Sequence, residues 1–402
     1  MLSDLVGGLA AAGFPIQVVC SRQLHDDAGA NLPAHDRVLG ARVFRIVTTR
    51  FGRGRLLGRA VDYATFYLGC VLILLKILKR GDVLVVKTDP PLMSLMAAPV
   101  AFLKGAKLVN WLQDVFPEVA SQLGAPWPPW LGAILRRLRD ASLRSADMNV
   151  LIGRRMRRYF EDGAIAAAIA APKLTVIENW ADAEMIHPKA CAESRLRVRL
   201  GFGDRFVVCY SGNLGRAHEF ETLLRAAEEL RSDAAFVFLI IGGGAKVAAL
   251  KQAVVEKALQ NFCFLPQQSR NSLEDSLAAA DVHLVSLLPQ LEGFIVPSKL
   301  YGIMAAARPA IFIGDSHGEV ARVLHNADCG ITVSIGDSTG LTRSLRALRA
   351  NRDGTAAMGR RARELMCEKY TLGRALERWM DVLAQLQGNQ TADVTELQLK
   401  DV

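Results

Sequence analysis

The sequence is poor in aromatic residues and in charges, and its cysteines follow no recognisable pattern. Of 402 residues, 7% are aromatic, 22% are charged and 51% are hydrophobic, so a globular chain with large cores is expected rather than disorder. The seven cysteines lie apart, without a C-x-x-C pair or a histidine at ligand spacing: Cys20, Cys70, Cys191, Cys209, Cys263, Cys329 and Cys367. Their scatter argues against a zinc site or a disulfide framework and indicates buried thiols in a reducing cytosol.

Aromatic residues are also absent from the arginine-rich part of the chain as stacking partners. The net charge is +9, and arginines gather in the first half: Arg50, Arg53, Arg55, Arg59, Arg136, Arg137, Arg139, Arg144, Arg154, Arg155, Arg157 and Arg158. This distribution favours a phosphate-bearing partner, such as a nucleotide or an anionic lipid, or else marks a solvated basic face. Nucleic acid is not expected as a partner, because single-strand binding sites interleave aromatic side chains with their cations.

Long hydrophobic runs are lacking as well. The chain opens without a basic segment, so no secretory signal peptide is expected. The longest apolar run, residues 64–78, is shorter than the ~20 residues of a membrane span and contains Lys76. It is either a core helix, the interpretation that we prefer, or a helix in the plane of a membrane, which the flanking arginines support.

Short apolar strands alternate with longer helical patterns along the whole chain. The expected strands are residues 16–20, 43–48, 83–87, 107–112, 148–152 and 174–177, followed by 206–211, 236–241, 262–265, 282–286, 309–313 and 330–333. This alternation is typical of βαβ units, and it predicts an α/β protein with two doubly wound domains. We expect the domains at residues 1–183 and 184–371, a boundary in the loop at 178–189, and a flexible polar tail at 388–402.

The first domain has no opening strand. Residues 1–12 predict a helix and residues 16–20 the second strand, whereas a doubly wound domain normally begins with a central strand and a ligand loop. We therefore expect the first strand of the N-terminal domain to be missing because the chain start is truncated. The alternative is a domain of unusual construction.

The loop after strand 206–211 carries Gly212, Asn213, Arg216 and His218 ahead of a predicted helix. Small residues there leave backbone N–H groups free at a helix N-terminus, which favours an anion. Arg216 adds a charge and His218 a switchable one. The loop predicts phosphate binding, against the alternative of an ordinary tight turn.

Two further loops between a strand and a helix are expected at the same end of the second sheet. Gly242 and Gly244 follow strand 236–241, and a sharp turn alone would also explain them. Glu292 precedes a helix entry at Ser298, where the serine would act as a local acceptor, and Lys299 would occupy the first turn. A cation there opposes the helix dipole unless an anion lies beside it, so a ligand phosphate is favoured over a solvated lysine.

In the first half, Asp114 and Glu118 follow strand 107–112. Two carboxylates at the carboxyl end of a strand are suited to hydroxyl binding or general-base catalysis. An N-cap at Asp114 and a solvated Glu118 in the first helical turn explain them equally well.

Together these stretches resemble the retaining glycosyltransferases of the GT-B fold, family 4, in the bacterial exopolysaccharide and O-antigen branch that includes colanic-acid-type transferases. The matching stretches are Gln-Asp-Val-Phe-Pro-Glu at 113–118, Glu-Asn-Trp at 178–180, Tyr-Ser-Gly-Asn-Leu-Gly-Arg at 210–216, Ile-Gly-Gly-Gly at 241–244 and Val-Pro-Ser-Lys-Leu-Tyr at 296–301. The resemblance implies two Rossmann-like domains facing a cleft, with a helix at 372–386 packing back on the first domain. It also implies a sugar transfer with retention that requires no metal or cofactor.

By that resemblance, the diphosphate is bound by Gly212, Asn213, Arg216 and Lys299. Glu292 contacts the donor sugar and Asp114 faces the reacting centre. The remaining predicted donor-binding residues are His218, Gly242, Gly244, Gly293, Phe294 and Ser298.

The sequence departs from the family pattern at three places. Asn213 and His218 stand where many relatives carry an arginine and a lysine, and Gly302 stands where a glutamate commonly holds the ribose. The third departure is the missing first strand and its glycine loop. These departures keep two alternatives open: a sugar-nucleotide epimerase of the same fold, and a degenerate GT-B protein that binds without turnover.

The prediction is a glycosyltransferase that uses a nucleotide-diphosphate sugar and a polyprenyl-linked or saccharide acceptor in cell-surface polysaccharide biosynthesis. A cytoplasmic protein bound peripherally to the anionic inner face of the plasma membrane is expected, because a Trp-Pro-Pro-Trp turn at 127–130 precedes Arg136, Arg137 and Arg139.

Overall fold

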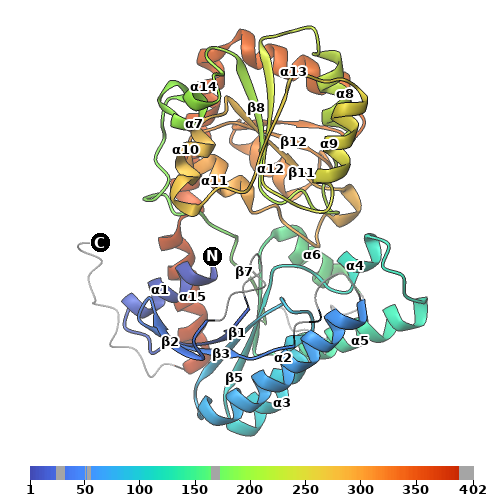
Figure 1. Ribbon diagram of the computed structural model, residues 1–402. Coiled ribbons are helices and arrows are strands. Elements are labelled where there is room, and N and C mark those ends of the chain that lie inside the picture. The colour runs from blue at the N-terminus through green and yellow to red at the C-terminus, as the bar shows by residue number, and fades with distance from the viewer. Residues whose placement is uncertain (24–31, 50, 52–55, 164–172, 389–402) are drawn as a thin grey trace.

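The computed structural model describes residues 1–23, 32–49, 51, 56–163 and 173–388. Two domains lie one above the other, and the chain begins and ends its described part in the lower one (Figure 1). Arg50, Arg53 and Arg55 and the predicted tail from residue 389 onward lie outside the described residues.

The N-terminal domain, which is the lower one in Figure 1, contains two sheets. Its elements are α1 (Leu2–Ala11), β1 (Gln17–Ser21), β2 (His35–Val38), β3 (Ala41–Ile46), α2 (Leu56–Ile77), β4 (Val83–Lys87), α3 (Met93–Lys104), β5 (Lys107–Leu112), α4 (Glu118–Gln122), α5 (Pro129–Ser145), β6 (Met148–Leu151), α6 (Arg154–Asp162) and β7 (Leu174–Val176). A parallel sheet has the order β4-β5-β6-β7, and a smaller sheet has the order β1-β3-β2. The six predicted strands are confirmed. Strand β2 was missed because its four residues are all exposed and show no apolar alternation.

The C-terminal domain is built on one parallel sheet of order β10-β9-β8-β11-β12-β13. Its elements are η3 (Cys191–Glu193), α7 (Arg195–Arg199), β8 (Phe206–Ser211), α8 (Glu221–Glu229), β9 (Phe236–Ile241), α9 (Val247–Glu256), β10 (Phe262–Leu265), η4 (Arg270–Ser272), α10 (Leu273–Ala278), β11 (Val282–Ser286), η5 (Pro289–Leu291), α11 (Lys299–Ala305), β12 (Ala310–Ile313), α12 (Glu319–Asn326), β13 (Gly330–Val333), α13 (Ser338–Ala350) and α14 (Arg352–Lys369). All six predicted strands are confirmed. Strand β9 is buried at every position, as expected of a strand covered on both faces by helices.

The last helix, α15 (Leu372–Gln387), leaves the C-terminal domain and returns to the lower one, where it packs against α1. Trp379 on α15 is fully buried, and its ring meets that of Trp111 edge to face at 5.2 Å. Trp180, from the segment between the domains, stacks on the other side of Trp111 at 5.9 Å. This tryptophan cluster joins the linker, the N-terminal sheet and the final helix in one core.

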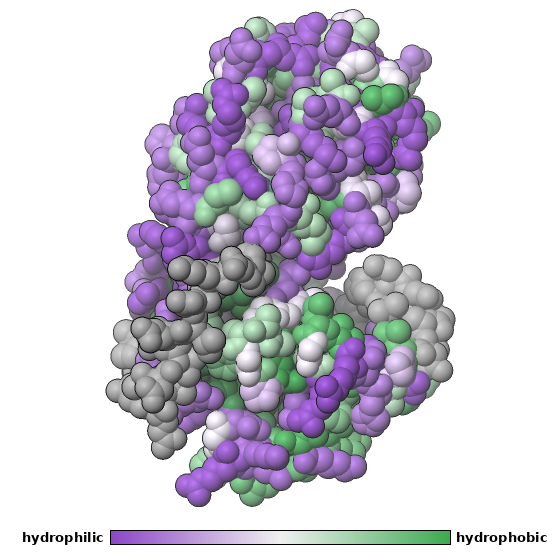
Figure 2. All heavy atoms as spheres, turned by 90° about the vertical axis from the view of Figure 1, so that its left-hand side faces the viewer, coloured by the Kyte–Doolittle hydropathy of each residue, from purple (hydrophilic) through white to green (hydrophobic). Residues whose placement is uncertain are grey.

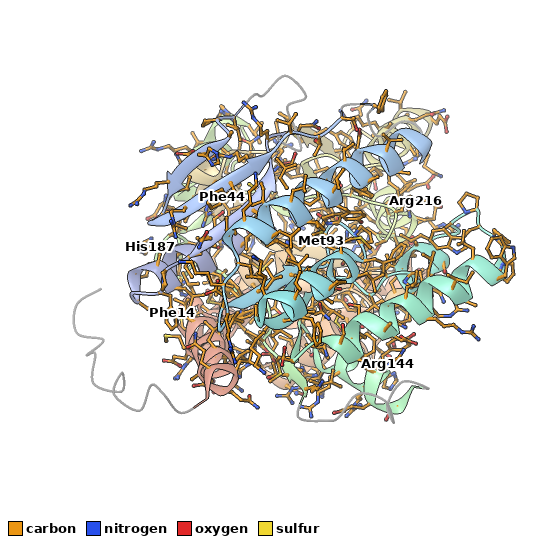
Figure 3. The ribbon with its side chains drawn as sticks, turned by 90° about the horizontal axis from the view of Figure 1, so that it is seen from below. Phe14, Phe44, Met93, Arg144, His187 and Arg216 are labelled. Atoms are coloured by element: carbon orange, nitrogen blue, oxygen red, sulfur yellow. The ribbon has the colours of Figure 1, made fainter. Side chains whose placement is uncertain are left out.

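The surface differs between the two domains. On the face shown in Figure 2, the upper domain is mostly hydrophilic, whereas hydrophobic atoms gather on the lower one. Helices α2, α3 and α5 lie side by side on the underside of the lower domain (Figure 3).

Helix α2 is not the core helix that we preferred from the sequence. Its stretch Ala60–Ile77 is long and apolar enough to cross a membrane, yet 11% of that stretch is buried. Cys70 and Leu74 face the protein, while Leu68 and Leu72 face outward and are more than half exposed. Burial in a core therefore explains the apolar residues of the inner face of α2 but not those of its outer face.

Candidate functional site

A cleft of about 630 Å³ lies between the two domains. Its walls come from both: Gln113, Asp114 and Ile152 from the lower domain, and Ser211, Gly212, Asn213, Ala217, His218, Pro297, Ser298, Lys299 and Gly302 from the upper one. The predicted residues Asp114, Gly212, Asn213, His218, Ser298 and Lys299 are thus brought together. Arg216, Gly242, Gly244, Glu292, Gly293 and Phe294 do not line the cleft.

Two glycine loops of the upper domain are tied to each other. The Gly212 N–H donates to the Ile241 carbonyl at 2.8 Å, and the Leu214 N–H donates to the Gly243 carbonyl at 2.7 Å. A Cβ at Gly242 would lie 2.3 Å from the Gly212 carbonyl oxygen, and the φ of Gly242 is +123°. Gly242 and likewise Gly244 therefore keep the first loop in position, while Gly212 itself faces the cleft.

The first loop leads into a helix, as predicted, but the helix N-terminus lies well beyond the glycine of the loop. Helix α8 begins at Glu221, nine positions beyond Gly212, so its N-terminus does not form the loop. Arg216 also departs from its predicted role, because its guanidinium donates to the Leu123 carbonyl of the other domain. Asn213 lines the cleft and supplies an amide rather than a charge.

His218 lies in the cleft wall as a neutral imidazole. Its Nδ1 is 2.6 Å from the Ser286 carbonyl, which assigns the ring proton to Nδ1. Burial lowers the pKa of His218 to about 4, and the neighbouring cation of Lys299 acts in the same direction. The switchable charge expected from the sequence is therefore absent at neutral pH.

Lys299 begins α11, as predicted, and its ammonium is shielded from solvent, with no hydrogen-bond acceptor in the part of the chain that the structure describes. Its Nζ lies 3.4 Å from the centroid of the Tyr210 ring, in a cation–π contact. A Cβ built on Gly212 would lie 3.8 Å from the same Nζ, so the lysine reaches the first loop. Burial lowers the pKa of Lys299 to about 7. Ser298 precedes it but makes no side-chain cap, which corrects the predicted acceptor role.

Asp114 is placed at the meeting point of the domains. Its backbone pairs with Ile295 of the upper domain as an isolated antiparallel bridge, and the next N–H, that of Val115, donates to the Phe294 carbonyl at 3.0 Å. The Asp114 carboxylate reaches solvent through the cleft, while both domain walls crowd it. This crowding, with the charge of Asp89, raises the pKa of Asp114 to about 6.

Asp114 does not cap α4, because the N-cap position is Pro117. Glu118, its partner in the sequence-based hypothesis, points away from the cleft and is buried. The Glu118 carboxylate accepts two hydrogen bonds from Arg139, at 2.9 and 3.0 Å, and a third from the Tyr159 hydroxyl at 2.9 Å. Neither the catalytic nor the solvated interpretation of Glu118 is correct, and Arg139 belongs to the core rather than to the surface.

Glu292 lies behind the cleft wall. Its Oε2 accepts the backbone N–H of Glu319 at 3.1 Å, at the start of α12. Burial raises the pKa of Glu292 to about 7, although the bond from Glu319 lowers it. The residues after it contact the lower domain: Gly293 lies beside the Arg155 carbonyl, and the Phe294 ring meets Tyr159 edge to face at 4.9 Å.

Among the described residues, no group of three or more His, Cys, Asp or Glu side chains is placed to hold a metal ion. The charged side chains of the cleft itself are the Lys299 ammonium, the Asp114 carboxylate and, at its far end, Asp4, Asp182 and Arg270.

Comparison with known proteins shows that the chain is similar to glycosyltransferases. Residues 193–365 match the family "Glycosyl transferases group 1". The chain is 30% identical over 270 residues to the probable glycosyltransferase WbjE of Pseudomonas aeruginosa, covering 66% of this chain and 65% of WbjE. It is also 30% identical over 227 residues to the putative colanic acid biosynthesis glycosyl transferase WcaI of Escherichia coli, covering 56% of this chain and 55% of WcaI. The alignments thus span less than two thirds of both relatives.

Solved structures decide the fold. Sucrose-phosphate synthase from Thermosynechococcus elongatus superimposes with a TM-score of 0.74 at 16% identity, covering 95% of this chain and 91% of that one. HepE of Anabaena, in complex with UDP and glucose, gives 0.70 at 16% identity, covering 96% and 95%. WaaG, a glycosyltransferase involved in lipopolysaccharide biosynthesis, gives 0.69 at 13% identity, covering 95% of each chain.

The fold is GT-B. The predicted fold class is therefore confirmed, with two Rossmann-like domains that face each other.

Sequence reasoning missed one wall of the GT-B cleft. Asn179, Trp180, Asp182 and Met185 line it, although we interpreted this segment as a domain boundary. A signal was available, because the segment follows the carboxyl end of β7, where ligands bind in open parallel sheets.

The far end of the GT-B cleft is closed by a contact between the domains. Arg270 donates to Asp4 at 2.7 Å, and both residues line the cleft. Gly302 lies in the same wall as Leu277. A Cβ on Gly302 would meet the Leu277 Cδ1 at 3.8 Å, an ordinary contact distance, so the backbone there has room for a side chain.

Proposed function

We propose that the protein is a retaining glycosyltransferase that moves a sugar from a nucleotide-diphosphate sugar to an acceptor hydroxyl. The match to group 1 glycosyl transferases and the likeness to WbjE and WcaI support sugar transfer. The UDP and glucose bound by HepE, which has the same fold, support a nucleotide sugar as the donor. The colanic acid named for WcaI supports a role in cell-surface polysaccharide biosynthesis.

The observation that carries the proposal is the Lys299 ammonium. It is a shielded cation at the cleft wall beside the Gly212 loop, and it has no hydrogen-bond acceptor among the described residues. A departing nucleoside diphosphate develops negative charge at its terminal phosphate, and a preorganised cation in a shielded site stabilises that charge strongly. Lys299 is proposed to leave the Tyr210 ring and to contact the donor diphosphate.

The other cleft residues take roles in the same proposal. Gly212 and Asn213 offer backbone and amide groups to the phosphates, and Asp114 faces the reacting sugar carbon from the opposite domain. Glu292 is proposed to act on the donor sugar through the loop that carries Gly293 and Phe294. Because cationic and polar groups hold the diphosphate, the proposal requires no metal ion.

The acceptor is proposed to be a polyprenyl-linked or free saccharide at the cytoplasmic face of the plasma membrane, with the protein attached peripherally. The acceptor reaches the donor from the lower domain, since Asp114 and Gln113 form that wall of the cleft.

The test combines binding, turnover and stereochemistry. The purified chain is screened by thermal shift against UDP, GDP, ADP and their sugar conjugates, and the stabilising donor is incubated with a membrane lipid extract that contains polyprenyl-diphosphate saccharides. A labelled lipid product whose new bond has the anomeric configuration of the donor supports the proposal, and EDTA leaves its formation intact.

Three results would contradict it. An isomerised nucleotide sugar that forms without acceptor identifies an epimerase. A product bond with the opposite anomeric configuration to the donor contradicts the retaining mechanism. Stabilisation by a nucleotide without turnover of any donor, with the lipid extract or with saccharide acceptors, identifies a binding protein.

A further inference from the structure

The underside of the lower domain carries three helices whose outward stripes are apolar. On α2 the exposed large hydrophobic residues are Val61, Leu68 and Leu72, at 44%, 63% and 53% exposure. Their spacing of seven and four places them on one helical face, and Lys76 continues this face by one turn. In a soluble amphipathic helix only the inward face is apolar, whereas α2 is apolar on its outward face as well.

Helices α3 and α5 repeat the pattern beside it. Phe102 and Leu103 at the end of α3 are 89% and 72% exposed, and they rank among the most exposed hydrophobic side chains in the described residues. On α5, Trp130, Ile134 and Leu138 follow one another at intervals of four, with 63%, 44% and 40% exposure. Half of the large hydrophobic side chains that are exposed in the described part of the chain belong to these three helices.

The three stripes lie on neighbouring helices, and together they are here called the α2–α3–α5 face. Helix α3 contacts α2 on one side and α5 on the other, and the three lie next to one another in the view from below (Figure 3). A concentration of exposed apolar side chains on neighbouring helices is unusual on a monomer that remains in water and indicates an interaction site.

The charges around the face identify its partner. Every exposed charged side chain described on the three helices is basic: Lys76, Arg136, Arg137 and Arg144. Arg139 is excluded, because it faces inward and binds Glu118. Apolar side chains surrounded by exposed lysine and arginine suit a bilayer surface with anionic headgroups, where the cations contact phosphate and the apolar groups enter the acyl boundary.

Helix α2 cannot leave this arrangement to cross the membrane without dismantling the domain. Its inner face is part of a core with α3 and the sheet, through Cys70 and Leu74, and it also contacts β1 and β3. A helix held along its length by the protein lies in the membrane plane.

We propose that the α2–α3–α5 face inserts into the interfacial region of an anionic bilayer, with α2 parallel to the membrane surface. The proposal gives the peripheral attachment in the proposed function a defined surface. It does not depend on glycosyl transfer, because vesicle binding is measured without donor or acceptor.

The test is co-sedimentation of the full chain with sucrose-loaded vesicles of phosphatidylcholine alone or with phosphatidylglycerol. The wild type binds the anionic vesicles, more weakly at high salt. The Leu72→Glu/Phe102→Glu variant loses binding by about tenfold or more, since two exposed apolar groups no longer enter the bilayer. Val255→Glu is the matched control: Val255 is 78% exposed on α9 of the upper domain, so its replacement leaves vesicle binding unchanged.

A second measurement reports the orientation. Trp130 lies on the face, so lipids brominated on their acyl chains quench its fluorescence, and the Trp130→Phe variant loses that quenching. A wild type that stays in the supernatant, a Leu72→Glu/Phe102→Glu variant that binds like the wild type, or Trp130 without quenching overturns the proposal. A wild-type dimer that this variant converts into a monomer, without vesicle binding by either, assigns the face to a second copy of the chain instead.

Discussion

The Lys299 ammonium lies 3.4 Å from the centre of the Tyr210 ring and has no hydrogen-bond acceptor among the described residues. A buried cation with an aromatic face in place of an anion is stabilised far less than a paired one, so an anionic ligand beside Lys299 would stabilise the protein. This relationship makes the candidate site testable by stability as well as by activity.

Lys299→Met should stabilise the ligand-free protein. Methionine fills similar space without a buried charge, and removal of an unsatisfied donor is worth about 1–3 kcal/mol. The pKa of Lys299 is about 7 in the folded chain and that of a free lysine is 10.5, so the penalty is complete below pH 7 and vanishes above pH 10.5. Denaturant unfolding at pH 7 and pH 9.5 should therefore give a larger gain at pH 7. The same variant should lose the thermal shift caused by nucleotides. A gain in unfolding free energy over the wild type that is equal at both pH values would contradict the buried charge.

Donor binding should be linked to proton uptake above pH 7. A bound diphosphate raises the pKa of Lys299, so above its free value of about 7 each binding event takes up as much as one proton. The affinity for the most stabilising nucleoside diphosphate then falls by up to about tenfold per pH unit. Calorimetry at pH 8 in two buffers of different ionisation enthalpy measures the uptake, and Lys299→Met is the control in which it disappears. Identical enthalpies in both buffers would exclude the linkage.

Asp114→Asn should reduce turnover by roughly 10²- to 10⁴-fold while nucleotide stabilisation stays intact, because the proposed function places the carboxylate at the reacting centre and not at the diphosphate. The pKa of Asp114 is about 6, so wild-type activity should rise as the pH increases through 6. Asp89 raises that pKa, and Asp89→Asn should move the inflection to lower pH. An unchanged pH profile in Asp89→Asn would remove Asp114 from the assignment.

Gly302→Glu should tighten nucleotide binding by about tenfold, if the carboxylate reaches the ribose, since a hydrogen bond to a charged group contributes about 1.5–3 kcal/mol. The site has space, because the nearest atom to a Cβ at Gly302 is the Leu277 Cδ1 at 3.8 Å. Gly302→Ala is the matched control, because it gives the helical backbone gain without the carboxylate. Equal affinities of both variants, measured by calorimetry, would show that no ribose contact is restored.

Arg139→Met should destabilise the lower domain by about 3–5 kcal/mol, because Glu118 would remain as an uncompensated buried charge. The side chains of Glu118 and Arg139 are 8% and 10% exposed. The double variant Glu118→Gln/Arg139→Met should recover much of that loss, since the introduced amide is neutral and its oxygen still accepts the hydrogen bond from Tyr159. Urea unfolding of the set gives the coupling energy, and additive losses would contradict a coupled pair.

Much of the fold was predictable from local sequence. Strands such as β8 and β9 are unbroken apolar runs, because helices cover both faces of a parallel sheet, and such runs are visible without any knowledge of tertiary contacts. Strand β2 was not predictable, because its four exposed residues pair with β3 without a hydrophobic pattern.

For the candidate site, the sequence by itself determined which loops follow which strands, and this was enough to place Gly212, Asn213 and Lys299 together at one sheet edge. The tertiary structure alone decided where individual side chains point. Glu118 and Asp114 lie four residues apart, yet one is buried against Arg139 and the other faces the cleft.

The same division holds for the surface. The sequence determined that residues 64–78 form an apolar helix, but it did not determine which of two apolar environments the helix faces. Burial in a core and contact with a membrane select the same residue types, since both replace water by hydrocarbon. Only the packing of α2 on α3 shows that Leu68 and Leu72 lie outside the core, and the membrane contact of this outer side is our proposal.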